Sequence, residues 1–185
     1  MTEISLNILD IAQNSIRAGS TLTEIIVKEI PSEDILSFSV KDNGCGMDKD
    51  LLKSVMDPFV TTRTTRKVGL GIPLLKSAAE QTGGNVTIES EVGVGTVLTA
   101  TFSYSHIDRQ PLGDISQAMV SLISMNPHID FVYRHFYESA CFELDTLKLR
   151  EILGDEVSLG EISVAQWIGE FIKDNLTEIY GGVVE

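Results

Sequence analysis

The stretch that decides how this chain is interpreted is Asp42-Asn43-Gly44-Cys45-Gly46-Met47. It directly follows residues 35–40, an apolar run that is typical of a β-strand. Asp-Asn-Gly is a turn signal, because glycine tolerates a positive φ and Asn or Asp can bond to its own backbone. A second glycine two positions later would let a flat ring lie close to the main chain. From these residues alone, a plain turn and a ligand-binding loop both stay open.

The sequence on either side predicts alternating helices and strands. Helical spacing of apolar residues covers 3–18, and strand character covers 22–30 and 35–40, which a short polar gap joins as an antiparallel hairpin. Later elements are expected in the order of a short helix at 48–56, a basic irregular loop at 61–67, a helix at 69–81, and strands at 85–90 and 97–103. This order predicts an antiparallel sheet with helices on one face.

A change in composition near residues 106–113 divides the chain into two predicted domains, 1–105 and 106–185. The second is expected to contain helices at 114–124, 147–153 and 164–179 and a hairpin formed by 131–136 and 140–144. His135 is expected in a strand with a surface role. This part has no chemical motif, so it is either a packing extension of the sheet or a surface for a partner or a second copy.

The overall composition excludes several classes of function. The chain has 185 residues and a formal net charge of -13, which argues against a nonspecific nucleic-acid binder. No apolar run approaches the roughly 20 residues that a membrane-spanning helix needs. The N-terminus lacks the pattern of a signal segment, so a cytoplasmic location is expected. Cys45 and Cys141 have no zinc-site spacing and are expected to be structural thiols.

Asp10 and Asn14 form a second informative patch. They lie four residues apart in a predicted helix, so both side chains emerge on one face about one turn apart. An Asn oxygen is a suitable Mg²⁺ ligand when phosphates and waters supply the other positions. A carboxylate one turn away could orient or deprotonate a nucleophile. The simpler alternative is a polar stripe on an amphipathic helix.

Gly69-Leu70-Gly71 immediately precedes an apolar helix. Free amide groups at a helix N-terminus bind phosphate oxygens, and glycine lets the phosphates approach. The basic loop that contains Arg63 and Lys67 comes directly before this patch and could close over a phosphate tail. The alternative for that loop is a solvated surface segment.

The fourth patch is Gly93-Val94-Gly95-Thr96, between two predicted strands. A plain hairpin turn accounts for it, but Thr96 could also present its hydroxyl to a nucleotide base, directly or through water. The carboxylate of Asp42 could accept a hydrogen bond from the amino group of adenine, which guanine lacks at that position.

Taken together, the four patches resemble the sequence boxes of one ATPase superfamily, the Bergerat fold. Its members include gyrase B subunits, ninety-kilodalton heat-shock chaperones, histidine kinases and MutL-type repair proteins. The resemblance covers about residues 3–105 and pairs 10–19 with the N box, 42–47 with the G1 box, 69–71 with the G2 box, 93–96 with the G3 box, and 57–63 with the lid entry of nitrogen-regulatory-type histidine kinases. It implies an α+β fold: a two-layer sandwich with a mixed, mainly antiparallel sheet and helices on one face, followed by a small α/β C-terminal extension.

The resemblance also implies that the ligand is ATP with Mg²⁺. By this resemblance, Asn14 would hold Mg²⁺, and Gly69 and Gly71 would flank the phosphates. Asp42 would bind the adenine amino group, with the backbone of Gly46 against the base and Thr96 near it. The implied nucleotide site is completed by Gly44, Met47, Arg63, Lys67 and Leu70. Asp10, the candidate catalytic residue, stands where MutL- and anti-sigma-type members have the longer Glu. Lys67 replaces the usual first glycine of the G2 box and adds a cation within possible reach of the γ-phosphate.

Three uses of ATP stay open. The chain could phosphorylate a separate partner protein, since no phosphoacceptor helix precedes residue 3 and all three histidines fall downstream of the boxes. It could hydrolyse ATP slowly and switch its contacts with a partner. It could also bind ATP as a regulatory module that uses residues 106–185 for interaction, with a homodimer as one possible arrangement.

Overall fold

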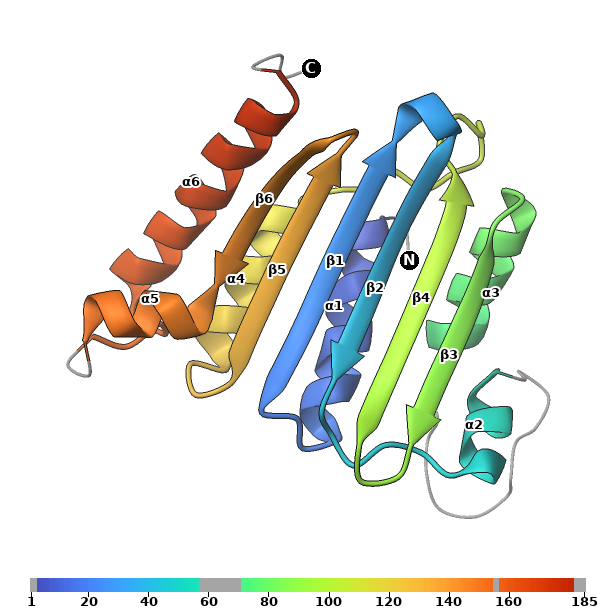
Figure 1. The fold of residues 1–185 in the computed structure, drawn as a ribbon, viewed down its shortest axis with the longest axis horizontal. Coiled ribbons are helices and arrows are strands. Elements are labelled where there is room, and N and C mark those ends of the chain that lie inside the picture. The colour runs from blue at the N-terminus through green and yellow to red at the C-terminus, as the bar shows by residue number, and fades with distance from the viewer. Residues whose placement is uncertain (1–2, 57–70, 155–156, 182–185) are drawn as a thin grey trace.

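In the described part of the chain, six β-strands form one mixed sheet in the order β3-β4-β2-β1-β5-β6 (Figure 1). The structure is a computed structural model and describes residues 3–56, 71–154 and 157–181. The strands are β1 Leu22–Ile30, β2 Ile35–Asp42, β3 Asn85–Glu91, β4 Gly95–Ser103, β5 Asp130–Tyr137 and β6 Ala140–Asp145. Neighbouring strands run antiparallel, except that β1 and β5 run parallel.

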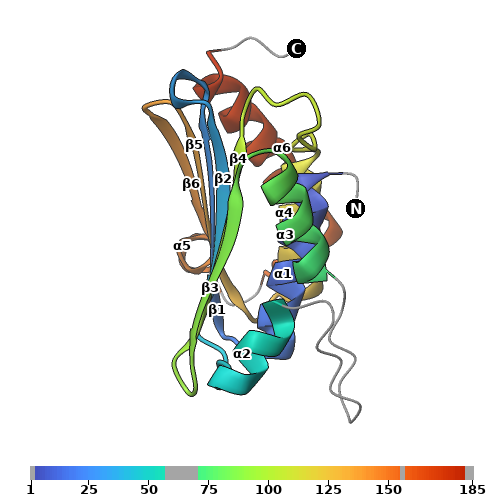
Figure 2. The same cartoon turned by 90° about the vertical axis from the view of Figure 1, so that its right-hand side faces the viewer.

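Four helices, α1, α3, α4 and α6, lie together on one face of the sheet (Figure 2). The helices are α1 Ile4–Arg17, α2 Lys49–Met56, α3 Gly71–Gln81, α4 Ile115–Met125, α5 Thr146–Leu153 and α6 Ile162–Ile179, and a short 3-10 turn, η1 Pro31–Glu33, joins β1 to β2. This arrangement confirms the predicted α+β sandwich with its C-terminal extension. Among these described helices, none is both long enough and apolar enough to cross a membrane.

The apolar pattern of the sequence explains why the two layers form. On α1, Ile4 and Ile8 recur at helical spacing and are fully buried. On β2, Leu36, Phe38 and Val40 alternate with more exposed residues and are buried almost completely. One core therefore fills the space between the helix layer and the sheet.

The residues after 106 extend this sheet at the side of β1. From the end of β4, α4 takes the chain back along the helix layer to the start of β5, which is the kind of crossover that a parallel neighbour requires. Leu22 of β1 pairs with Asp130 of β5, and Glu29 pairs with Tyr137 at the other end. β6 then returns as the predicted antiparallel hairpin. That residues 1–105 and 106–185 are separate domains stays a prediction.

The expected surface role of His135 is wrong, because the structure buries this side chain completely. Side chains along a strand alternate between the two faces of a sheet. Phe131, Tyr133 and His135 are all buried, so they share the face of β5 that the helices cover. His135 is thus a polar residue at a core position.

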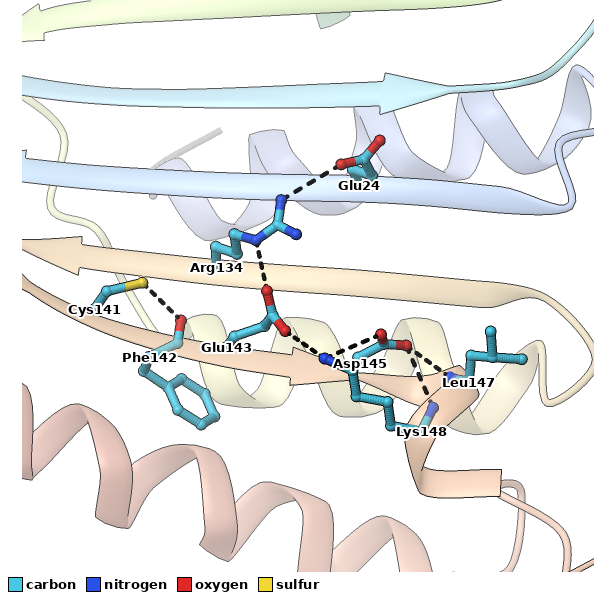
Figure 3. Close-up of polar contacts among 8 residues, drawn as sticks. All are labelled: Glu24, Arg134, Cys141, Phe142, Glu143, Asp145, Leu147 and Lys148. Carbon is cyan, nitrogen blue, oxygen red and sulfur yellow. Dashed lines mark hydrogen bonds and ion pairs between the residues drawn. The ribbon is translucent and has the colours of Figure 1, made fainter. Parts of the chain in front are cut away.

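The opposite face of the sheet has a row of alternating charges across the strands (Figure 3). Lys41 Nζ lies 3.0 Å from Glu24 Oε1, and Arg134 Nη1 lies 3.5 Å from Glu24 Oε2. The row continues from Arg134 Nε to Glu143 Oε2 at 2.7 Å and from Lys148 Nζ to Glu143 Oε1 at 2.8 Å. Exposed pairs of this kind contribute roughly 0–1 kcal/mol each. The row connects β2, β1, β5 and β6 with the start of α5 on this face of the sheet.

The fold brings three of the sequence boxes to one end of the sheet. Asp42 at the end of β2 pairs with Thr96 near the start of β4, so the G1 and G3 patches are neighbours. The amide of Cys45 donates to the carbonyl of Ala18 just after α1, at 2.9 Å, which brings the N box to the same place.

Candidate nucleotide site

Asp42 is buried at the end of β2, where it joins the helix layer to the following turn. Its Oδ2 accepts a hydrogen bond of 2.7 Å from Ser15 Oγ, and its Oδ1 accepts one of 2.9 Å from the Gly44 amide. The side chain belongs to a residue that is only 9% exposed, so these bonds fix its orientation. A carboxylate has about four acceptor positions, which leaves capacity for a further donor.

Ser15 is a site residue that the sequence reasoning did not single out. It lies next to Asn14 in the N box, but it is on the buried side of α1, where Ile8, Ile11 and Ala12 also lie. A serine among these apolar residues needs a partner, and Asp42 supplies it. A polar residue at a buried helical position is the signal that could have identified it.

Gly46 follows Asp42 and makes a close contact with the turn between β3 and β4. Its φ is +66°, and a Cβ at this position would overlap the carbonyl oxygen of Glu91. Only glycine meets both conditions without strain. The amide of Gly93 also donates to the carbonyl of Cys45 at 2.9 Å. The contact with the chain's own backbone therefore accounts for this glycine, and its predicted role beside the base stays a prediction.

Ser90 links Met47 and Thr96, two residues of the predicted nucleotide site. The Met47 amide donates to Ser90 Oγ at 2.8 Å, and Ser90 Oγ lies 2.8 Å from Thr96 Oγ1 and 3.0 Å from the Gly95 carbonyl. The Ser90 hydroxyl has one proton, so when it donates to Gly95 it must accept from Thr96. The oxygen of Thr96 then stays available as an acceptor. Ser90 lies outside the four patches, and nothing in its local sequence marks it.

Asp10 lies on α1 beside the first residue of α3. A Cβ on Gly71 would overlap Asp10 Oδ2, so the carboxylate is in direct contact with the start of that helix. A negative charge is favourable there, because the free amides of a helix N-terminus carry a partial positive charge. The structure thus brings Asp10 of the N box next to Gly71, the residue of the G2 box that lies within the described ranges.

Asn14 is exposed near the end of α1, and its side chain faces Arg17. Arg17 Nη1 donates to Asn14 Oδ1 at 3.0 Å. The lone pair of Asn14 Oδ1 that accepts from the guanidinium could instead coordinate a metal ion. It cannot do both at the same time. Arg17 was not singled out from the sequence, although it lies three residues after Asn14, one turn along the same helix.

The described residues contain part of the predicted site. Asp10, Asn14, Asp42, Gly44, Gly46, Met47, Gly71 and Thr96 are within them, while Arg63, Lys67, Gly69 and Leu70 lie outside. Across the ranges that the structure describes, no group of three or more His, Cys, Asp or Glu side chains is arranged to hold a metal ion. The oxygen atoms of Asp10 and Asn14 are nevertheless of the type that Mg²⁺ prefers.

Comparisons with known proteins identify the family of this chain. The family model described as histidine kinase-, DNA gyrase B-, and HSP90-like ATPase matches residues 2–106. Sporulation kinase E of Bacillus subtilis is 34% identical over 101 residues, and histidine protein kinase SaeS of Staphylococcus epidermidis is 29% identical over 103. These matches cover 55% and 53% of this chain but only 13% and 29% of the two kinases.

A solved structure supports the same fold. The ATPase domain of Aquifex aeolicus MutL, solved with ADP, superimposes with a TM-score of 0.51 at 16% identity, over 83% of this chain and 69% of that one. At this identity the likeness concerns the fold alone. The matched family model spans more than half of the sequence, including all four sequence boxes. The chain therefore belongs to the family of histidine kinase-, DNA gyrase B- and HSP90-like ATPases, which are ATP-binding domains.

Proposed function

We propose that this chain binds ATP with Mg²⁺ at the site formed by α1, β2, β4 and α3, and transfers the γ-phosphoryl group to a separate protein. The observation that carries the proposal is the convergence of Asp10, Asp42 and Gly71 at one end of the sheet. Asp42 is buried and held by Ser15 and Gly44, whereas Asp10 lies at the start of α3. One carboxylate would thus face the nucleotide base and the other would lie near the phosphate chain.

Asp42 would recognise the adenine amino group through its unused acceptor positions. Its two existing bonds, to Ser15 and to the Gly44 amide, keep the carboxylate in place before the nucleotide arrives. A pre-oriented group loses little entropy on binding. The oxygen of Thr96, across the β2–β4 pair, would accept a further hydrogen bond from the base or from a bridging water.

The phosphate end would lie between α1 and the start of α3. Asn14 would supply an oxygen ligand that suits Mg²⁺, and the first amides of α3 would donate to phosphate oxygens. Bound Mg²⁺ would neutralise charge that develops on the phosphates. Arg17 would release Asn14 Oδ1 to the ion and turn its guanidinium towards a phosphate oxygen.

In the transfer step, a nucleophilic nitrogen or oxygen of the partner would attack the γ-phosphorus. The bond between this phosphorus and the bridging oxygen would break, and the electron pair would leave with ADP. Asp10 would accept the proton of the nucleophile, directly or through a water molecule. The chain's own His135 is excluded as the acceptor because it is fully buried.

Two observations support a kinase acting on another protein. The two relatives named above are kinases by name, and the region of similarity is confined to part of each of them.

A second candidate function, an ATP-dependent switch or slow hydrolase, is favoured by the way the extension meets α1. The amides of Ile4 and Ser5 donate to the carbonyls of Pro111 and Leu112, at 2.9 and 2.8 Å. α4 also packs against α1. A nucleotide-dependent shift of α1 would therefore reach residues 106–185 directly. Asp10, being shorter than Glu, would give slow hydrolysis.

The test uses the full chain with Mg²⁺ and radiolabelled ATP, in the presence of proteins that co-purify with it. We expect label on a co-purifying protein, and loss of this label in the Asp10→Asn variant. Asp174→Asn, an exposed change on α6, is the matched control and should leave transfer unchanged.

Calorimetry of ATP binding, together with the assay of phosphate release, distinguishes the kinase from the switch or hydrolase. ATP binding with steady phosphate release and no labelled partner would favour the switch or hydrolase over the kinase. The absence of ATP binding by the wild-type chain, or unchanged binding after Asp42→Ala, would overturn both proposals.

A further inference from the structure

A second polar site lies at the other end of the sheet, where β1, β5 and α6 meet. Its central residue is Glu29, which is 6% exposed and lies on the side of β1 that the helices cover. Ile25 and Val27 occupy the same side of this strand and are fully buried. A carboxylate among such residues is costly unless its charge is compensated.

The hydrogen bonds to the Glu29 side chain come from a histidine and a tyrosine. His135 Nε2 lies 2.9 Å from Glu29 Oε1, and the hydroxyl of Tyr180 donates to the same oxygen. The hydroxyl of Tyr133 lies 2.5 Å from His135 Nδ1. His135 therefore links Glu29 to Tyr133 in one buried network.

The environment of the two tyrosine hydroxyls favours their protonated form. Burial, followed by the charge of Glu29, raises the pKa of both the Tyr133 and the Tyr180 hydroxyl far above the ordinary value. Among the described residues, no Lys or Arg side chain bonds to the Glu29 carboxylate.

The remaining carboxylate oxygen of Glu29 faces a cavity. Both side-chain bonds described above go to Oε1. Within the described ranges, no buried side-chain oxygen or nitrogen lacks a partner. Because no described residue bonds to Oε2, this atom must be accessible, and Glu29 indeed lines a cavity of about 900 Å³. This volume is in the range of small-molecule sites.

The cavity wall also contains three aromatic rings and one ion pair. Tyr104, Tyr137 and Tyr180 line it, and the rings of Tyr137 and Tyr180 lie 4.8 Å apart in an edge-to-face arrangement. Lys173 and Asp114 line it as well, with Lys173 Nζ 3.8 Å from Asp114 Oδ2. Lys173 therefore pairs with Asp114 and not with Glu29.

Tyrosine rings beside a buried carboxylate are the chemistry that recognises organic cations. The chain itself contains an example at this place, because the guanidinium carbon of Arg109 lies 5.0 Å from the centre of the Tyr104 ring. We propose that this cavity binds an organic cation through a guanidinium or primary ammonium group, which pairs with Glu29 Oε2 and lies against Tyr137 and Tyr180. The site is distinct from the nucleotide site and does not depend on the proposed function.

Calorimetry on the full chain tests this inference with three probes. Agmatine represents a free cation, acetyl-arginine amide represents an arginine side chain of a partner protein, and acetyl-citrulline amide is the uncharged control. Binding of agmatine alone would identify a free small molecule as the source of the cation. Binding of both cations would allow a protein side chain. Equal binding of the citrulline analogue, or no binding of either cation, would overturn the proposal.

Variants on the two faces of β1 provide the matched comparison. Glu29→Gln keeps the Oε1 acceptor for His135 and Tyr180 but removes the charge, and should weaken cation binding roughly tenfold or more. Glu24→Gln removes a carboxylate from the opposite face of the same strand and should leave it unchanged. Tyr137→Leu should weaken binding roughly three- to thirtyfold through the lost ring.

Two further measurements control for loss of folding and for the location of the site. Circular dichroism at 25 °C would verify that Glu29→Gln is folded, and Tyr137→Leu provides an independent result if it is not. Asp42→Ala should keep full cation binding, because it lies at the other end of the sheet. Unchanged agmatine affinity in both folded cavity variants would contradict the inference.

Discussion

The carboxylate of Asp10 and the backbone of Gly71 are in direct contact, although 61 positions separate them in the sequence. One residue lies on α1 and the other is the first residue of α3. A carboxylate at a helix N-terminus is stabilised by the free amides there. A bound phosphate would accept hydrogen bonds from the same amides. Asp10 and the phosphate chain would therefore both lie at the partial positive charge of the α3 N-terminus.

Gly71→Ala should therefore reduce phosphoryl transfer without unfolding the protein. The new Cβ would overlap Asp10 Oδ2 and force the carboxylate to rotate away. Alanine is a better helix former than glycine by roughly 1 kcal/mol, which offsets part of the strain. We expect transfer or phosphate release to fall about tenfold or more, since misplaced catalytic groups are costly. Thermal unfolding should shift by only a few degrees.

Ser77→Ala is the matched control for this change, because Ser77 is an exposed residue of the same helix. Its activity should equal that of the wild type. If Gly71→Ala binds and turns over ATP normally, Asp10 has no role that depends on its position at α3.

Ser15→Ala tests how Asp42 is held. The change removes the 2.7 Å hydrogen bond to Asp42 Oδ2 and leaves the Gly44 amide as its described partner. Loss of a hydrogen bond to a charged group costs roughly 1.5–3 kcal/mol. We expect a lower midpoint in urea unfolding and ATP binding that is weaker by up to tenfold, measured by calorimetry. An unaltered ATP affinity together with lower stability would mean that Ser15 supports the fold alone.

The sequence was sufficient to predict the elements whose apolar residues follow one period. The spacing of Ile4, Ile8 and Ile11 predicts α1, and the run from Ile35 to Val40 predicts β2. It was insufficient for contacts between distant polar residues. Nothing local to Ser90 shows that it bonds to Met47 and Thr96, because that contact depends on how the β3–β4 turn meets the G1 patch.

His135 is a second case in which the sequence alone was insufficient to predict a contact. Alternation with Phe131 and Tyr133 places it on the covered face of β5, whereas a polar residue taken alone is expected at the surface. Its partner Glu29 is 106 positions away and becomes its neighbour only because β5 pairs in parallel with β1. The charge pattern of a single strand does not contain this information.

Gly46→Ala should destabilise the protein more than Gly93→Ala. Both residues have positive φ, +66° and +78°, so each alanine variant adopts a left-handed backbone that costs roughly 1–2 kcal/mol. At Gly46 the Cβ would also overlap the carbonyl of Glu91, whereas at Gly93 nothing lies within 4 Å. We expect the loss in unfolding free energy to be at least twice as large for Gly46→Ala in urea titrations. Equal losses would show that the contact with Glu91 is easily relieved.

The charged row on the uncovered face should make stability depend on pH. Hydrogen bonds from Lys148, and then from Arg134, lower the pKa of Glu143 below its usual value of 4.5 (Figure 3). A carboxylate with a lowered pKa in the folded state stabilises the protein above the unfolded pKa, and this contribution is lost as the pH falls through the folded pKa. Because the Glu143 side chain is 35% exposed, Glu143→Gln should cost only about 0.3–1 kcal/mol at pH 7. Urea unfolding should show a smaller cost at pH 3 than at pH 7, while Glu89→Gln, an exposed change on β3, should have no effect at either pH. A deficit for Glu143→Gln that is the same at both pH values would mean that the packing of the side chain, and not its charge, holds β5 and β6 together.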